Sequence, residues 1–563
     1  MDATSTIGAT LGVAAHLCLF IRGEWHVLAP QVFSFYVLCF FLVVGLHYWG
    51  VDKDIVSSAS TALHWALWHL LGLFGSITIY RIAFHPLRRF PGPFLAKISK
   101  LWHIWGCRTS QNHLFLDRLR EKYGDFVRTG PNEITIFHPS GLASINRIED
   151  VARGQWYDLV RPSFSVNTVR DQALHHQRRR VWEAAFTAEA MKDYEHRIRK
   201  YAINVETDLH RSNSATVNMN SIVYQFAYSV MGDLAFSKEA DSSDMEWQRT
   251  VNTMHMGLSL LGPLSPAPWI ALLFFSFTWL PLVHDWNSMM QYCSSKMQDR
   301  VARSSDQKSR DIASWLIRDA ERRGRLGTVD EKKWLDGDGF SVILAGSDTT
   351  ASTLVFSFYY LAKRPEYQVR IRNELLQLLH DRDAGDEAED RRLAALNFRD
   401  FERLPFLNAL IDETLRLHHP LPTAGARVVR NPHGINIGGQ HIPHGTDVIA
   451  PRWNDGRSET HYERARDFVP ERWLPEYPPG QVTEKRLSTN RRAFTPWAGG
   501  KWACLGKPLA LFEMRYLIAL LVKNFSISFP QGEDGDAVER DYKDQVTAFP
   551  GKLRLRFKEM SSI

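Results

Sequence analysis

Cysteine is scarce in this sequence, and its five copies are widely scattered: Cys18, Cys39, Cys107, Cys293 and Cys504. A disulfide framework normally shows as an even number of closely spaced cysteines in a small secreted chain. A chain of 563 residues with this cysteine pattern is therefore not expected to depend on disulfides. The pattern favours a reducing compartment.

Several other features are missing as well. The sequence has no long basic run and no nucleic-acid motif, so we expect no nucleic acid among its partners. Its net charge of +6 is mild and favours a surface that faces a membrane or docks a protein partner. It also lacks internal repeats and a flavin or nicotinamide fingerprint. Any electrons that it uses must therefore come from a separate protein.

The N-terminus, in contrast, is rich in apolar sequence. Three segments, residues 7–21, 31–49 and 62–80, contain no Asp, Glu, Lys or Arg. A helix that crosses a bilayer needs about 20 mostly apolar residues, so we expect two to three transmembrane helices within a membrane anchor at residues 1–83. The first segment has a cleavable signal peptide as its alternative, although no basic residue precedes it.

Basic residues predict the orientation of this anchor. Five of them follow the third segment closely: Arg81, Arg88, Arg89, Lys97 and Lys100. Because the cytoplasmic flanks of transmembrane helices are enriched in Lys and Arg, the chain beyond this segment should lie in the cytosol. Prolines in residues 84–93 cannot continue a helix, so a hinge is expected there, followed by a large domain at 94–563.

Cys504 lies in the loop WAGGKWACLG, residues 497–506, directly before an apolar run. Glycines permit tight backbone turns in this loop, and Pro508 suits the first turn of a helix. A thiolate at a helix N-terminus is stabilised by the dipole and by free N–H groups, which makes Cys504 a candidate ligand of a planar cofactor. The alternative is an inert core cysteine, the commoner role of a lone cysteine in apolar surroundings.

Three more segments carry polar residues at helical spacing. Residues 340–362 form an apolar run that predicts a buried helix, with AGSDTT in its middle. Glu413 and Arg416 are three residues apart, and His175 and Arg179 are four apart, so each pair shares a helix face. Each of these features has an ordinary structural alternative when it is taken alone. The AGSDTT segment could be a polar kink in a core helix, the Glu413–Arg416 pair a surface salt bridge, and the His175–Arg179 pair a solvated basic face.

In this order, the segments resemble the motifs of the cytochrome P450 family. WAGGKWACLG resembles the haem loop, AGSDTT the oxygen-activation motif, and the Glu413–Arg416 pair with PERW at 470–473 the two ion-pair elements. The segment YRIAFHPLRRFPGP is similar to the corresponding segment of filamentous-fungal members of the family. Over residues 80–560 the resemblance implies a mainly α fold with small β-sheets, the cytochrome P450 fold, preceded by N-terminal transmembrane helices.

The resemblance also implies roles for individual residues. Cys504 would be the thiolate ligand of the iron of haem b. Asp348 and Thr349 would relay protons for oxygen activation, as an acid beside an alcohol can do. A structural ion-pair network would join Glu413 and Arg416 to Arg472 of the PERW segment. The remaining expected haem contacts are His175, Arg179, Ala345, Gly346, Arg427, Trp497, Gly500, Lys501 and Gly506.

Two positions of the loop depart from the family pattern. Trp502 stands where a basic residue or histidine is usual, and Ala498 also differs. Lys501, one place before Trp502, is expected to supply the missing positive charge to a haem propionate.

Other positions are expected to meet substrate or a partner. No Asp, Glu, Lys or Arg lies between Arg249 and Asp285, and we expect an apolar lid there that dips into the membrane surface and admits lipophilic substrate. An internal buried helix is the alternative. Arg178 and Arg180 are expected to face outward, where they could dock an acidic redox partner. Substrate contacts are expected at Trp156, Phe164, Val166, Thr547, Ala548 and Phe549.

The expected function is that of a membrane-anchored haem-thiolate monooxygenase. It would act on a lipophilic small molecule, an intermediate of fungal secondary metabolism. Electrons would come from NADPH through the flavins of a separate NADPH-cytochrome P450 reductase, with cytochrome b5 as a second candidate donor. A multi-pass protein of the endoplasmic reticulum with a cytosolic catalytic domain is implied. The alternatives are an isomerase or dehydratase of the same fold that does not use O2, and a non-catalytic membrane haem-binding protein.

Overall fold

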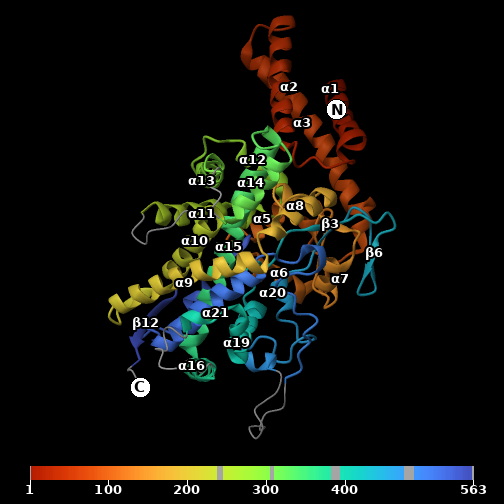
Figure 1. Cartoon of the computed structure of the whole chain (residues 1–563). Helices are drawn as coiled ribbons and strands as arrows, with labels where there is room; N and C mark the ends of the chain where they lie inside the picture. Colours follow the sequence, from red (N-terminus) through yellow and green to blue (C-terminus); the bar gives the residue numbers. More distant parts are fainter. Residues whose placement is uncertain (1, 238–244, 305–309, 382–392, 475–486, 561–563) are drawn as a thin grey trace.

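Three long helices at the N-terminus stand away from the rest of the molecule (Figure 1). The computed structural model describes residues 2–237, 245–304, 310–381, 393–474 and 487–560. Helix α1 covers Ala3–Ala15 and continues as a π-helix at His16–Phe20, α2 covers Ala29–Gly50, and α3 covers Ile55–Ile79. By length and composition, each is able to cross a membrane. The third begins at Ile55 rather than at residue 62, because Asp54 caps it by accepting hydrogen bonds from Val56 N and Ser57 N.

Helices α1 and α3 pack tightly against each other. A Cβ at Gly12 would lie 2.1 Å from His69 O, and one at Gly72 would lie 2.1 Å from Ala9 O, so neither glycine can be replaced without moving a backbone. His16 Nδ1 and Ser76 Oγ are 2.8 Å apart. Close approach through small residues is typical of helices that pack within a bilayer. The first segment is thus a partner of α3 in the folded chain.

The connection to the large domain is packed onto that domain. A π-helix at Tyr80–Phe84 and a 3₁₀ helix at Pro86–Arg89 lead into it, and Leu87 is completely buried. Arg128 Nη1 donates to Arg81 O at 3.1 Å. The proline-rich segment therefore fixes the direction in which the anchor leaves the domain.

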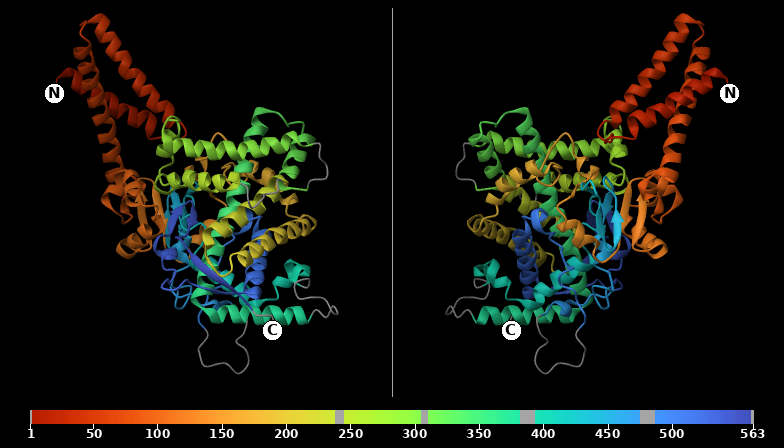
Figure 2. Two further views of the ribbon diagram at one scale, coloured as in Figure 1. Left: turned by 90° about the vertical axis from the view of Figure 1, so that its left-hand side faces the viewer. Right: turned by 90° about the vertical axis from the view of Figure 1, so that its right-hand side faces the viewer.

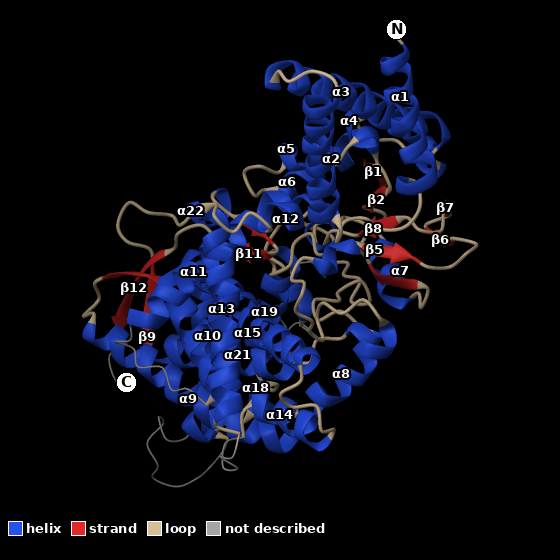
Figure 3. Cartoon of the chain, turned by 90° about the horizontal axis from the view of Figure 1, so that it is seen from above, coloured by secondary structure: helices blue, strands red, loops and turns tan. Residues whose placement is uncertain are grey.

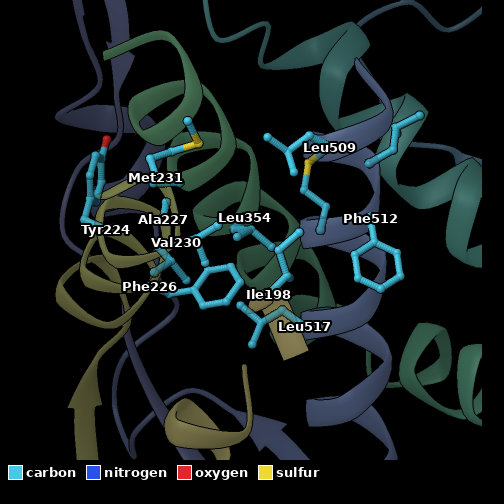
Figure 4. Close-up of a cluster of buried hydrophobic side chains, with 14 of the residues drawn as sticks. Ile198, Tyr224, Phe226, Ala227, Val230, Met231, Leu354, Leu509, Phe512 and Leu517 are labelled. Atoms are coloured by element: carbon cyan, nitrogen blue, oxygen red, sulfur yellow. The ribbon is translucent and has the colours of Figure 1, made fainter. Parts of the chain in front are cut away.

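Long helices form the core of the large domain, as an apolar period of 3.6 residues requires. The central helix is α15, Val329–Lys363. Helices α10 (Met219–Phe236) and α21 (Lys507–Asn524) pack against it, and α9 (Ala188–Arg211) packs against α10 and α21. Figure 4 shows Ile198, Leu354 and Leu517 close together where these helices converge. Further helices are α4 Phe94–Ile98, α5 Leu101–Gly106, α6 Asn112–Tyr123, α7 Gly141–Arg147, α8 Gln172–Ala184, α14 Ile312–Arg322, α16 Pro365–His380, α18 Phe398–Phe401, α19 Pro405–Leu417, α20 Arg452–Asp455 and α22 Ala537–Arg540.

The strands are short and gather in small sheets (Figure 3). The largest sheet has the order β1-β2-β8-β5-β3, and the others pair β10 with β11, β6 with β7, and β12 with β4 and β9. The mainly α fold with small sheets is thus confirmed. The strand bounds are β1 Phe126–Gly130, β2 Glu133–Ile136, β3 Val151–Arg153, β4 Thr216–Asn218, β5 Arg427–Val429, β6 Ile435–Ile437, β7 Gln440–Ile442, β8 Asp447–Ile449, β9 Phe525–Ser528, β10 Lys543–Gln545, β11 Thr547–Phe549 and β12 Arg554–Glu559.

The uncharged stretch before Asp285 forms helices that face the anchor. Helices α11 (Met245–Leu264) and α13 (Pro281–Ala302) flank the short α12 (Pro268–Phe275), which contacts α2. The Phe33 and Phe277 rings meet edge to face with centroids 5.9 Å apart, while Trp279 is 78% exposed. The stretch is therefore not an internal buried helix, and its insertion into a membrane surface stays a prediction.

Candidate active site

Cys504 occupies the turn that joins a 3₁₀ helix at Gly500–Trp502 to α21. Its N–H donates to Trp497 O at 2.9 Å, which closes the loop. Loss of hydration raises the pKa of the Cys504 thiol, while the N–H groups of Gly506 and Lys507 lower it. A Cβ at Gly506 would lie 3.9 Å from the sulfur, an ordinary van der Waals contact. The turn thus presents a thiol that a cation or metal would convert to thiolate.

The other cysteines are placed differently. Cys107 and Cys293 are buried, and burial raises the pKa of each thiol to about 12. Cys18 and Cys39 belong to the anchor helices. Of the cysteines in the described residues, Cys504 is the one outside the anchor that is exposed. This is the arrangement that ligand binding by a cysteine requires.

The backbone of the loop is held in shape from two directions. Gly500 has φ +57°, which glycine adopts freely, whereas Ala498 has φ +55°, which costs a non-glycine residue roughly 1 kcal/mol. Arg179 donates to Lys501 O at 3.2 Å and to Ala503 O at 2.8 Å, so it holds the loop directly. Alanine at position 498, which differs from the family pattern, therefore adopts a strained backbone conformation.

Positive charge collects beside the loop around the ring of Trp502. The guanidinium carbons of Arg153 and Arg427 each lie 4.5 Å from the ring centroid, and the His175 ring lies 4.7 Å from it. Burial and the neighbouring cations lower the pKa of His175 to about 3. Burial lowers the pKa of Arg153 to about 9, and the positive charge of Arg427 adds to this lowering. Trp502 thus serves as a platform for two arginines where the family has a basic side chain.

No carboxylate among the described residues forms an ion pair with Arg153 or Arg427. Arg153 Nε and Arg427 Nη1 are buried without a hydrogen-bond partner. Buried cations are normally paired, so this cluster fits an anionic group such as the two propionates of haem. Lys501 instead reaches Glu149 O and Gln172 Oε1, both at 3.4 Å. The residues present therefore fit haem, which Cys504 would hold at the iron and the arginines at the propionates.

Sequence reasoning missed Arg153. It lies on β3, and the antiparallel pairing of β3 with β5 sets Arg153 directly opposite Arg427. The two residues are far apart in the chain, and β3 has only three residues. No local pattern could have found the pair, because the register of the two strands creates it.

One turn of the otherwise buried central helix α15 is accessible. From Leu335 to Ala362 every residue is buried except Asp336, Ala345, Gly346 and Thr349. The last three share one face, and Thr349 Oγ1 donates to Ala345 O at 2.6 Å. A Cβ at Gly346 would lie 2.6 Å from Met231 Sδ, so this glycine lets α10 approach. The AGSDTT segment thus supplies the one accessible turn of the buried part of the described helix.

Asp348 points away from that turn into the protein. Tyr228 donates to Oδ1 at 2.6 Å and Thr547 to Oδ2 at 3.0 Å, while His255 Nε2 lies 3.8 Å from Oδ1. Burial raises the pKa of Asp348, and these three partners act against that rise. Sequence reasoning proposed Thr547 as a substrate contact and missed Tyr228 and His255. Their elements, β11, α10 and α11, meet Asp348 only in the folded chain.

Glu413, Arg416 and Arg472 form a buried network. Arg416 donates to both Glu413 oxygens at 2.7 and 2.8 Å, and Arg472 Nε donates to Oε1 at 3.1 Å. Val469 N and Trp473 Nε1 also donate to the same carboxylate. All three charged side chains are completely buried. The network ties α19 to the segment that precedes the cysteine loop.

Two groups of predicted contacts have mixed outcomes. The prediction for Arg178 is wrong, because it is buried and donates to Glu331 at 2.8 Å and to Asp338 at 2.6 Å. Helix α8 turns that residue inward with the same face as His175, whereas Arg180 is exposed.

Among the expected substrate contacts, Phe164 packs on Trp334, Val166 is buried and Ala548 N donates to Pro420 O. Trp156 lines a cavity of about 1660 Å³ between the anchor helices and the domain, and Phe549 packs on Tyr224 and His255.

Comparison with known proteins gives a consistent picture. The family model described as "Cytochrome P450" matches residues 91–554. "Cytochrome P450 monooxygenase notG'" from Aspergillus versicolor is 35% identical over 95% of this chain and 94% of its own length. "Tryprostatin B 6-hydroxylase" from Aspergillus fumigatus is 33% identical over 97% and 95%. A solved structure, "Crystal structure of cytochrome P450DA heme domain", aligns with a TM-score of 0.62 at 18% identity, covering 80% of this chain and 94% of that one.

Proposed function

The chain belongs to the cytochrome P450 family, and we propose that it inserts one oxygen atom from O2 into a lipophilic intermediate of fungal secondary metabolism. Relatives from Aspergillus versicolor and Purpureocillium lilacinum are named as cytochrome P450 monooxygenases, and the chain is an oxidoreductase of the same kind. Membership implies haem with a cysteine thiolate as the iron ligand, and a redox partner. We further propose that the partner is NADPH-cytochrome P450 reductase, with cytochrome b5 as a second donor.

The observation that carries the proposal is the placement of Cys504. It is an exposed cysteine just before α21, beside buried Arg153 and half-buried Arg427, neither of which pairs with a carboxylate among the described residues. Bound haem with a thiolate ligand supplies the oxygen activation that side chains cannot perform. The polypeptide contributes the sulfur of Cys504, and Arg153 and Arg427 would hold the propionates.

Two residues of the central helix would handle protons. Thr349 places its hydroxyl at the open turn of α15, and Asp348 is the adjacent acid, with a pKa that burial raises. A raised pKa favours a carboxyl group that holds a proton, as a general acid must. This pair favours oxygen chemistry over the isomerase or dehydratase alternative, which needs no such proton supply.

The proposed location is the membrane of the endoplasmic reticulum. The three N-terminal helices would span it, with residues 1–83 as anchor, 84–93 as connector and 94–563 as the cytosolic catalytic domain. Lys and Arg follow α3, which agrees with the positive-inside rule. Exposed Arg180 is proposed to contribute to the docking of an acidic redox partner.

The deciding experiment is the difference spectrum of dithionite-reduced, carbon-monoxide-bound protein in membranes, followed by turnover with ¹⁸O2. A strongly red-shifted Soret band is expected, and it should disappear in Cys504→Ala but persist in Cys293→Ala. Product formation should require NADPH, the reductase and O2, with one ¹⁸O atom per product. A product formed without O2 would support the isomerase or dehydratase, and a haem spectrum without any reductant-dependent turnover would support a binding protein.

A further inference from the structure

The carboxyl group of Asp348 faces away from the place where its proton would be used. Tyr228 of α10 donates to Oδ1 at 2.6 Å, and Thr547 of β11 donates to Oδ2 at 3.0 Å. The accessible turn of α15, where Thr349 places its hydroxyl, lies on another face of the helix. Any proton that replaces the one on Asp348 must therefore arrive from the side where α10, α11 and β11 meet.

The two hydrogen-bond donors on that side are unsuited to supply a proton. Burial and the charge of Asp348 raise the pKa of the Tyr228 hydroxyl well above its usual value, so this hydroxyl keeps its proton near neutral pH. Thr547 is a buried alcohol, and alcohols are not among the side chains that titrate in this range. Both residues hold the carboxylate in place, but neither exchanges charge with the solvent.

The third neighbour of the carboxylate is His255 of α11. Its Nε2 lies 3.8 Å from Asp348 Oδ1, and this nitrogen is buried without a hydrogen-bond partner among the described residues. The side chain of His255 as a whole is 18% exposed, against 1% for Asp348. Imidazole is the side chain that normally gains and loses a proton between pH 5 and pH 8. His255 is thus in reach of both the buried acid and water.

Aromatic side chains hold the ring of His255 in place. It meets the rings of Tyr224 and Phe549 edge to face, with centroids 4.7 and 4.6 Å apart. Helix α11, which carries His255, lies beside α13 at the end of the catalytic domain from which the anchor helices extend (Figure 2). The distance from Nε2 to Asp348 Oδ1 exceeds that of a hydrogen bond, so proton transfer needs an approach of about 1 Å or one bridging water.

The charge of Asp348 couples the two groups. Burial lowers the pKa of His255, and an ionised Asp348 acts against this lowering. The imidazole therefore binds a proton most tightly just after the carboxyl group has lost its own. In the described part of the chain, His255 is the one basic side chain within 4 Å of this carboxylate. Burial raises the pKa values of nearby Tyr224, Cys293 and Tyr542, so these groups stay uncharged near neutral pH.

We propose that His255 is a positioning residue that places a solvent-derived proton on Asp348 each time the acid has given up its own. In this step the Nε2–H bond of the imidazolium breaks and an O–H bond forms at Oδ1, so both groups become neutral. The imidazole then regains a proton from water. Rotation of the Asp348 side chain between rotamers would turn the acid toward Thr349. This inference rests on the proposed function, which uses the proton at Thr349.

The test follows the carboxylic acid C=O band of Asp348 by infrared spectroscopy, with the full-length holoenzyme in phosphatidylcholine nanodiscs. The band is identified by its loss in Asp348→Asn. Transfer into D2O shifts the band as the acid exchanges its proton, and the rate of this shift measures the proton route. His255→Phe keeps a ring against Tyr224 and Phe549 but cannot carry a proton, so exchange should slow at least about tenfold. His255→Gln should slow it equally, whereas His196→Phe, at an exposed position of α9, should keep the parent rate.

Several results would overturn the role of His255. Parent exchange rates in both His255 variants would do so, as would a rate that falls in Tyr228→Phe alone. A parent rate in His255→Gln with a slow His255→Phe would mean that His255 acts as a hydrogen-bond donor and not as a proton carrier. If His255→Phe does not load haem, the rate of His255→Gln decides.

Two further observations complete the test. A parent protein without an acid band of Asp348 at neutral pH would overturn the proposal, because the carboxyl group would hold no proton to replace. Failure of the proposed function would instead appear as a carbon-monoxide spectrum without the red-shifted Soret band. That spectrum depends on Cys504 and leaves the exchange rate at Asp348 unaffected, so the two failures are distinguishable.

Discussion

Replacing Glu413 with glutamine should destabilise the catalytic domain far more than an equivalent change at the surface. The carboxylate accepts five hydrogen bonds, from Arg416, Arg472, Val469 N and Trp473. Glutamine has nearly the same shape, but it lacks the charge and turns an NH2 group toward arginine donors. Both guanidinium groups are then left buried without a counter-charge.

The expected size follows from that burial. Removing one partner of a buried ion pair costs about 3–5 kcal/mol, against a total stability of about 5–15 kcal/mol for a typical protein. A domain of roughly 470 residues has an unfolding entropy of about 1 kcal/mol per kelvin. The melting temperature of Glu413→Gln should therefore fall by about 3–5 °C if the domain unfolds as one unit.

The matched control is Asp208→Asn. Asp208 and Arg211 are also three residues apart on a helix, but their side chains are 57% and 76% exposed. An exposed pair of this kind contributes about 0–1 kcal/mol, so this variant should melt within about 1 °C of the parent. Melting is followed by Soret absorbance and tryptophan fluorescence on holoprotein in nanodiscs. Equal shifts in melting temperature for Glu413→Gln and Asp208→Asn would refute the argument that burial makes the Glu413 network important for stability.

Three further predictions concern other parts of the molecule. Thr349→Ala should consume NADPH at a rate near that of the parent but release peroxide in place of product, and tight coupling would remove Thr349 from the proton route. Arg178→Ala should lower stability by about 3–5 kcal/mol and Arg180→Ala by less than about 0.5 kcal/mol; a thermal shift assay in which the two match would contradict the burial of Arg178. Burial raises the pKa of Asp544 to about 7, so its stabilising contribution is complete below the unfolded value near 3.9 and is lost as pH rises towards about 7. Asp544→Asn should therefore gain about 2 kcal/mol relative to the parent between pH 5 and pH 7, and a pH-independent difference in melting temperature would contradict this assignment.

Local sequence was enough to predict the elements that carry the chemistry. The glycine-rich turn before α21, the buried helix α15 and the three apolar N-terminal helices all follow from turn propensity, apolar period and segment length. Each of these properties belongs to a stretch of about 10–30 residues and does not depend on the rest of the chain. The family resemblance then linked the stretches in order.

Contacts between distant residues were beyond such reasoning. The direction of Arg178 was predicted wrongly, because whether an arginine is exposed depends on which acids pack against its helix, here Glu331 and Asp338. The partners of Asp348 and the docking of Glu24 on Arg170 were not anticipated for the same reason.

The sequence by itself therefore determined the family, the cysteine that presents its thiol, the polar pair of the central helix and the apolar anchor. Only the tertiary structure decided how charge is distributed around them. Strand register brought Arg153 opposite Arg427, and helix packing buried Glu413 with two arginines. The physical reason is that helix and turn formation depend on neighbouring residues. The energy of a buried charge instead depends on every group that the folded chain places within a few ångströms of it.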